Sequence, residues 1–144
     1  MVTIREWYER ANDVWPDDLP ELSVWESLRA ARKLWRYATG RSFGGKIEPV
    51  RRSNEYTWVR RGVLYVNHNR VTFVPGRGCV GGWRSFVHDL GHCIDYRTGA
   101  RRTAGRPHSK QHARLEARLA KQVLRRGWLD GKLKQHQPLP KGDM

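Results

Sequence analysis

Apolar residues near the beginning of the chain recur with the spacing of an α-helix. One stripe of such positions is formed by Val24, Leu28, Ala31, Trp35 and Ala38. Thr3 with Glu6, and Ser23 with Glu26, each fit the capping box, in which a hydroxyl and a carboxylate three residues apart close the first turn of a helix. We therefore predict helices near residues 4–14 and 24–38 within a helical N-terminal part, residues 1–40.

The pattern changes after Gly40 to short segments rich in β-branched and aromatic residues. These segments are separated by turn-like sequences and cover residues 46–50, 56–60, 63–66 and 71–74. We predict that they form a small antiparallel sheet within residues 46–75. His68 falls in one of the turns, where we interpret it as a polar turn residue rather than a metal ligand.

A glycine-rich sequence, residues 76–81, matches the G-x-G-x-x-G fingerprint of dinucleotide-binding folds. That fingerprint requires a parallel βαβ unit, whereas hairpins are predicted before it and helices after it. We interpret residues 76–81 as a loop that binds no cofactor.

Helical spacing returns in the last part of the chain. An apolar stripe is formed by Trp83, Val87, Leu90 and Ile94. This stripe predicts a helix over residues 83–96. At 100° per residue, His88, His92 and Asp95 lie within about 60° of one another on a different face of that helix. The helix face that carries the two histidines is therefore separate from the apolar face that packs in the core.

A final helix is predicted over residues 109–126, with Gly127 after its end. The metal-site helices then cover residues 83–127. The tail, residues 129–144, is basic and is predicted to be disordered. We therefore expect one domain, residues 1–128, followed by a tail.

Charge is distributed unevenly along the chain. The 144 residues carry a net charge of +14, but residues 1–30 hold seven acids against three bases, a balance of −4, which leaves +18 for the rest. The strongly basic remainder of the chain is attracted to polyanions, and nucleic acid is the commonest polyanion in a cytoplasm. We expect nucleic acid as a partner; the alternative is a merely solvated surface.

The sequence has no run of eighteen apolar residues and no secretory signal. We therefore expect a cytoplasmic protein that does not bind a membrane. Cys79 and Cys93 are fourteen residues apart, do not form a C-x-x-C motif and are expected to be ordinary reduced thiols.

Four of the six histidines form two pairs with the spacing of one helical turn, His88 with His92 and His108 with His112. Two histidines at this spacing on a helix direct their imidazoles to one point, the arrangement found in zinc sites. Catalytic zinc typically takes three protein ligands and one water. We predict a Zn²⁺ site made by His88, His92 and His108, with His112 as the alternative third ligand. Glu116, four residues beyond His112, is either an orienting partner for a ligand or an ordinary helix acid.

Residues 83–128 resemble the SprT-like branch of the zincin metallopeptidases and small phage-encoded proteins of that type. The similarity lies in the H-x-x-x-H helix and in Pro107-His108-Ser109-Lys110, which matches a P-H-G-K-like element that carries the family's third histidine. It implies a zincin-like α+β fold, a protein substrate, zinc bound by His88, His92 and His108, and Asp89 at the position of the general base. Family members include DNA-associated proteases, and a phage origin would place the protein in the host cytoplasm. The family's glutamate is replaced here by Asp89, which is shorter by one methylene, about 1.5 Å.

Two other functions remain open. Val87-His88-Asp89-Leu90-Gly91-His92 locally resembles HD-domain phosphohydrolases, in which an adjacent His-Asp pair binds metal. That all-helical fold needs a further histidine upstream, where only His68 is available. The other alternative is a noncatalytic module that binds zinc and nucleic acid.

Overall fold

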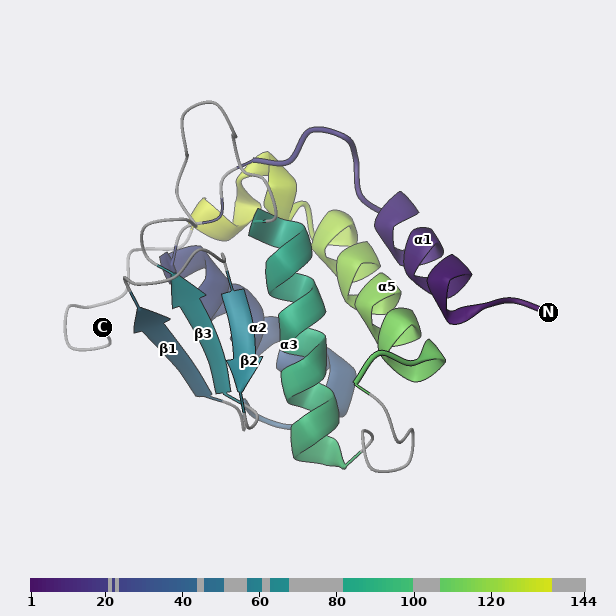
Figure 1. Cartoon of the computed structure of the whole chain (residues 1–144). Helices are drawn as coiled ribbons and strands as arrows, with labels where there is room; N and C mark the ends of the chain where they lie inside the picture. The colour runs from purple at the N-terminus through teal and green to yellow at the C-terminus, as the bar shows by residue number, and fades with distance from the viewer. Residues whose placement is uncertain are drawn as a thin grey trace.

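The computed structural model describes residues 1–20, 22, 24–43, 46–50, 57–60, 63–67, 82–99 and 107–135. Within these ranges the α-helices are α1 (Ile4–Asp13), α2 (Val24–Thr39), α3 (Gly82–Thr98) and α5 (Lys110–Arg125). Two short 3₁₀ helices follow α5, namely η1 (Trp128–Asp130) and η2 (Lys132–Gln135). All four predicted helices are present, with ends within two residues of the predicted ones (Figure 1).

Capping side chains fix where two of these helices begin. The Thr3 hydroxyl accepts a hydrogen bond from the backbone N–H of Glu6 at 3.1 Å, as the capping box predicted. The Ser109 hydroxyl caps α5 in the same way, since it accepts from the backbone N–H of His112 at 3.1 Å. Ser109 therefore places His108 just before α5 and His112 in its first turn.

The strands are β1 (Lys46–Val50), β2 (Thr57–Arg60) and β3 (Val63–Asn67), in the spatial order β1-β3-β2. β2 and β3 pair as the predicted antiparallel hairpin. β1 instead pairs in parallel with the other edge of β3. The predicted antiparallel sheet is therefore wrong, because the hairpin serves as the crossover that a parallel neighbour requires. The fourth predicted strand, residues 71–74, lies outside the described residues.

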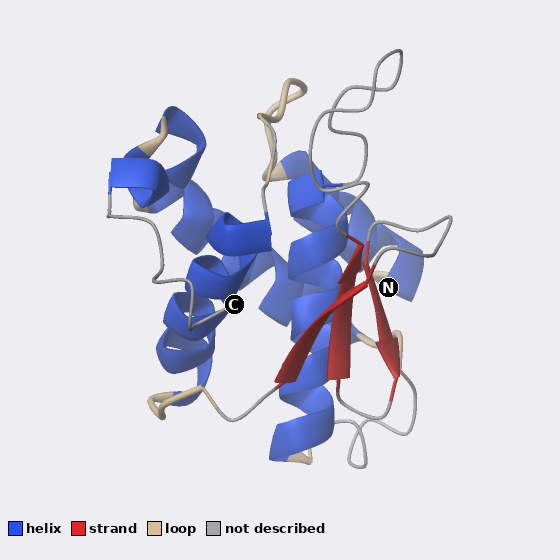
Figure 2. Cartoon of the chain, turned by 90° about the vertical axis from the view of Figure 1, so that its left-hand side faces the viewer, coloured by secondary structure: helices blue, strands red, loops and turns tan. Residues whose placement is uncertain are grey.

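The predicted fold class, a zincin-like α+β domain with an antiparallel sheet, is also wrong: the described part of the chain is predominantly a helical fold. Among the residues whose burial the structure describes, α2, α3 and α5 supply most of the apolar core. α3 lies between the sheet and α5, and α1 packs along α5 on the far side from the sheet (Figure 1). Viewed from the side of the sheet, the strands lie in front of helices (Figure 2). The site is therefore built on helices.

Trp83 is the centre of the aromatic core and has no exposed surface. Its ring centroid lies 6.5 Å from that of Trp15, 6.2 Å from that of Phe86 and 6.4 Å from that of Trp128. These partners come from the chain after α1, from α3 and from η1. One tryptophan on α3 thus ties three parts of the chain together and holds α3 in place.

Ordered structure continues beyond the predicted domain end at residue 128. Leu133 in η2 is 1% exposed and belongs to the core. Leu129 packs against the same core, so the first residues of the expected tail contribute to it. Residues 136–144 lie outside the described part. Among the described helices, none has the length and apolar character needed to cross a membrane.

Candidate metal centre

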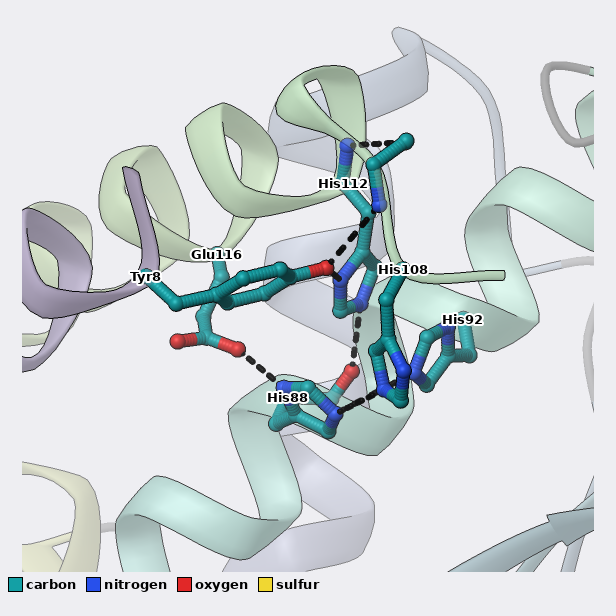
Figure 3. Close-up of polar contacts among 7 residues, drawn as sticks. Tyr8, His88, His92, His108, His112 and Glu116 are labelled. Carbon is teal, nitrogen blue, oxygen red and sulfur yellow. Dashed lines mark hydrogen bonds and ion pairs between the residues drawn. The ribbon is translucent and has the colours of Figure 1, made fainter. Parts of the chain in front are cut away.

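Two helices bring four histidines together. His88 and His92 lie one turn apart on α3, half-buried beside its fully buried apolar face. His108 and His112 approach them from the start of α5 (Figure 3). The predicted separation of the histidine face from the core face of α3 is confirmed.

Three Nε2 atoms meet around His88. The Nε2 atom of His88 lies 3.1 Å from that of His92 and 3.2 Å from that of His108. In a tetrahedral zinc site with Zn–N distances of 2.0–2.1 Å, neighbouring nitrogens are about 3.3–3.4 Å apart. Both spacings are therefore close to those of nitrogens that share one metal ion.

Glu116 determines which nitrogen of His88 carries the proton. Its carboxylate is 4% exposed and pairs with Nδ1 of His88. A carboxylate only accepts, so Nδ1 of His88 is the donor, and in the neutral ring Nε2 presents a lone pair toward His92 and His108. A carboxylate behind a histidine is a common device of metal sites, because it fixes the ring and raises its basicity.

The pKa of His88 reflects the same pair. Burial lowers this pKa, but the hydrogen bond and the negative charge of Glu116 outweigh burial, so the pKa is raised. The pKa of His108 is lowered, first by its partial burial and then by the positive charge that a protonated His88 carries. Glu116 thus makes the His88 ring more basic, and the neutral form of that ring, with an unprotonated Nε2, is the form that binds a metal ion.

Both ring nitrogens of His112 have hydrogen-bond partners outside the other imidazoles of the cluster. Its Nε2 lies 2.9 Å from the backbone oxygen of His88, which only accepts, so Nε2 carries the proton. Its Nδ1 lies 2.6 Å from the hydroxyl of Tyr8 and therefore accepts from it. The ring is fully buried and stacks on His92 with centroids 3.7 Å apart. Burial lowers the pKa of His112 to about 4, so the ring is neutral.

Tyr8 reaches this network from α1, which packs against α5. Besides donating to His112, its hydroxyl oxygen accepts from the backbone N–H of Ser109 at 3.3 Å. Burial raises the pKa of Tyr8 to about 12, so the hydroxyl remains a donor. α1 is thereby connected to the start of α5, next to His108.

Gly91 allows α5 to approach α3 at the site. A Cβ atom at this position would lie 3.0 Å from Nε2 and 3.3 Å from Cδ2 of His112. Because His112 is held by two hydrogen bonds and by stacking, its ring has little freedom to move aside. Glycine at position 91 therefore lets α3 and α5 approach each other without displacing the His112 ring.

His88, His92 and His112 lie close enough to bind a metal ion, since one ligand atom of each falls within 4.8 Å of the others. Binding through His112 would require the loss of one of its two hydrogen bonds. His108 offers its Nε2 to His88 and is exposed, with no such constraint. The histidine cluster therefore contains possible metal ligands and, in His112, a ring whose two nitrogens already have hydrogen-bond partners in the protein.

A cavity of about 630 Å³ opens beside the histidine cluster. It is lined by Tyr8, His88, Asp89, His108 and Glu116, among others. Asp89 therefore faces the same space as two of the predicted zinc ligands. A substrate in this cavity would be within reach of a carboxylate and of the imidazoles.

The structure brings together the predicted residues His88, His92, His108 and Asp89. Two residues of the site were not predicted from the sequence, Tyr8 and Gly91. No local sequence pattern indicates Tyr8. A glycine in the middle of a predicted helix, as at Gly91, does indicate a position where another element packs closely. Cys93 is buried, and burial raises its thiol pKa to about 12, so it remains a protonated core thiol. His68, the glycine-rich loop and Cys79 lie outside the described residues.

Comparison with known proteins gives no relative for this chain. No protein-family model, no curated protein and no solved structure matches it. The site itself therefore provides the evidence for function.

Proposed function

We propose that the protein is a zinc-dependent peptidase, with zinc held by His88, His92 and His108. The observation that carries this proposal is the position of His88. Its Nε2 lone pair faces two other Nε2 atoms at 3.1 and 3.2 Å, while Glu116 binds the opposite side of its ring. Three imidazoles are the ligands of many catalytic zinc sites, which leave one position open for water.

Zinc bound there would polarise the peptide carbonyl and make water a better nucleophile. Asp89, which lines the cavity, accepts the proton that the attacking water loses and delivers it to the leaving amine. Glu116 keeps the proton of the neutral His88 ring on Nδ1, so that Nε2 is free of a proton and can bind the metal. His112 binds no metal in this proposal; it supports His92 by stacking and holds the backbone of His88.

The proposal rests on the site and not on the fold, since one fold serves many chemistries. The resemblance of residues 83–128 to SprT-like peptidases agrees with the order of the three ligands. In the described residues β1 pairs with β3 in parallel, which differs from the antiparallel sheet expected from that resemblance. The ligand geometry is the stronger support.

Asp89 distinguishes this proposal from its alternatives. For the peptidase, Asp89→Asn should keep bound zinc and lower hydrolysis of casein by about 10²–10⁴-fold, while Asp89→Glu should preserve or raise it. Metal content by mass spectrometry and cleavage by gel electrophoresis measure both effects. Loss of zinc in Asp89→Asn would favour an HD-type phosphohydrolase, in which this aspartate is a ligand. Bound zinc without hydrolysis of proteins or phosphate esters would favour a noncatalytic module.

We also propose that nucleic acid is a partner, because cations gather around Trp7 on the surface formed by α1 and α5. The charged groups of Arg10, Lys110 and Arg114 lie 4.9, 5.0 and 6.0 Å from the centre of the Trp7 ring system. Cation–π contacts hold these side chains in place without using their N–H donors. The donors remain available to phosphates, which supports binding of a nucleic-acid backbone.

A further inference from the structure

The cavity that Asp89 lines extends along α3 from the histidine cluster toward the beginning of the helix. On α3 it is lined by Arg84, Ser85, His88 and Asp89. The first helix supplies a second wall, at Ile4, Arg5, Tyr8 and Asn12. One cavity therefore contains a proposed zinc ligand, the proposed general base and the side chain of Arg84.

Arg84 lies one helical turn before His88. Side chains four residues apart on an α-helix are neighbours, separated by about 6 Å along the axis and about 40° around it. An extended peptide advances about 3.3 Å per residue. A substrate group bound by Arg84 would therefore lie within about two residues of a peptide bond held at His88.

The side chain of Arg84 is anchored but retains hydrogen-bond donors. Its Nη2 atom donates to the backbone oxygen of Pro16, just after α1, at 3.3 Å. This is the one hydrogen bond that Arg84 makes to the described residues, and its Nε atom is buried without a partner there. A guanidinium carries five N–H donors, so Arg84 can bind a further acceptor while Pro16 keeps it in place.

The cavity has no general excess of positive charge, because Asp89 and Glu116 line it together with Arg5 and Arg84. Glu116 is already paired within the histidine cluster, and Arg5 pairs with the exposed Glu9 at 3.3 Å. Arg84 has no ion pair with a described residue. A dianion such as a phosphate monoester would meet two carboxylates in this cavity. A single carboxylate is repelled less and matches a guanidinium through two parallel hydrogen bonds.

We propose that Arg84 binds a carboxylate of the substrate within about two residues of the bond that is cut, an inference that rests on the proposed peptidase function. The carboxylate belongs either to an aspartate or glutamate side chain or to the C-terminus of the substrate. Both sources present the same chemistry to the guanidinium, and amidation of the C-terminus distinguishes them.

Fluorogenic octapeptides test this contact. Asp or its neutral isostere Asn stands at each position in turn, and each peptide is made with a free and with an amidated C-terminus. The zinc-loaded proteins are the wild type, Arg84→Gln and the matched control Arg125→Gln. Arg125 is exposed on α5 and does not line the cavity.

The wild type and Arg125→Gln should cleave the carboxylate form of a peptide about tenfold better, in kcat/KM, than its neutral form. That form is Asp over Asn if a side chain is bound, and the free over the amidated C-terminus if the terminus is bound. Arg84→Gln should reduce the ratio to about one, mainly by slowing cleavage of the carboxylate form.

A wild type without either preference, or a preference that is unchanged in Arg84→Gln, would overturn the inference and leave the peptidase function intact. An equal loss of cleavage of both forms would also overturn it, because Arg84 would then only hold the chain at Pro16. If Arg84→Gln does not fold, Arg84→Lys decides: it keeps the charge but not the planar fork and should retain only part of the preference, whereas an unchanged preference overturns the contact.

Absence of cleavage of every peptide would overturn the peptidase function. The contact is then tested by fluorescence polarisation with labelled Asp and Asn octapeptides, free and amidated. The wild type should bind the carboxylate form more tightly, and Arg84→Gln should not. Equal binding of all forms by the wild type would overturn the inference.

Discussion

His88 and His112 show how hydrogen bonding gives different roles to neighbouring residues of one type. Glu116 on one side of His88 leaves the Nε2 lone pair of that histidine directed at two other imidazoles. In His112 both nitrogens are occupied, by Tyr8 and by a backbone oxygen. By distance alone, His112 belongs with the possible metal ligands. Its two hydrogen bonds instead indicate a structural role.

Replacement of His108 and of His112 should therefore have different effects. His108→Ala removes an exposed side chain that we propose as a zinc ligand, and it should abolish stoichiometric zinc binding with little change in stability. His112→Phe keeps a ring but removes both hydrogen bonds of His112 and leaves the Tyr8 hydroxyl without an acceptor, at a cost of about 1–3 kcal/mol. It should lower the free energy of unfolding while weakening zinc affinity by only about 10–100-fold.

Zinc titration with a competing chelator and denaturant unfolding measure these two effects. Full zinc binding in His108→Ala, together with its loss in a folded His112→Phe protein, would show that His112 is the third ligand.

At the scale of elements, the site depends on how closely α3 and α5 approach each other. α3 is held by the Trp83 cluster at one end and packs against α5, whose first turn is set by the Ser109 cap. Gly91 removes the side chain that would otherwise keep His112 away. The histidine cluster is thus a consequence of helix packing.

Gly91→Ala tests this dependence. Alanine in a helix interior usually gains about 0.5–1 kcal/mol over glycine. Here its methyl would press on the fixed His112 ring, and overpacking of this kind costs about 1–3 kcal/mol. We expect a net loss of roughly 1 kcal/mol and weaker zinc binding, measured by denaturant unfolding and chelator competition. Gly99→Ala cannot serve as the control for a glycine-to-alanine change, because Gly99 has a positive φ of 82°, which strains an alanine.

Ala117→Gly provides a control for helix propensity, since residue 117 lies inside α5, half-buried and away from the histidine contacts. It should lower stability by about 0.5–1 kcal/mol without changing zinc binding. A Gly91→Ala protein that is more stable than the wild type and binds zinc normally would contradict the close-approach explanation.

The sequence predicted the helices and the histidine pairs better than it predicted the sheet. Helical spacing over 10 to 17 residues is a strong signal, and it placed His88 and His92 on a face separate from the core. The pairing of β1 with β3 depends on contacts between segments that are distant in the sequence, and local sequence patterns do not predict such contacts. Tyr8 could not be predicted for the same reason, since it meets His112 across 104 positions of the chain.

At the scale of the whole molecule, the net charge of +14 acts together with the cations around Trp7. Binding of single-stranded or duplex oligonucleotides should be tolerant of sequence and should weaken steeply between 50 and about 200 mM salt. Lys110→Glu should reduce affinity and flatten the salt dependence relative to Lys121→Glu, on the exposed surface of the same helix. Fluorescence polarisation over a salt series measures both. Absence of binding at low salt would remove nucleic acid as a partner.

The central claim is that three imidazoles of this chain hold one zinc ion. X-ray absorption at the zinc edge of the purified protein tests it most directly. We predict about one zinc per chain, with three nitrogen neighbours and one oxygen at about 2.0–2.1 Å. A protein purified with zinc present that contains none, or a zinc ion with sulfur neighbours near 2.3 Å, would contradict the claim.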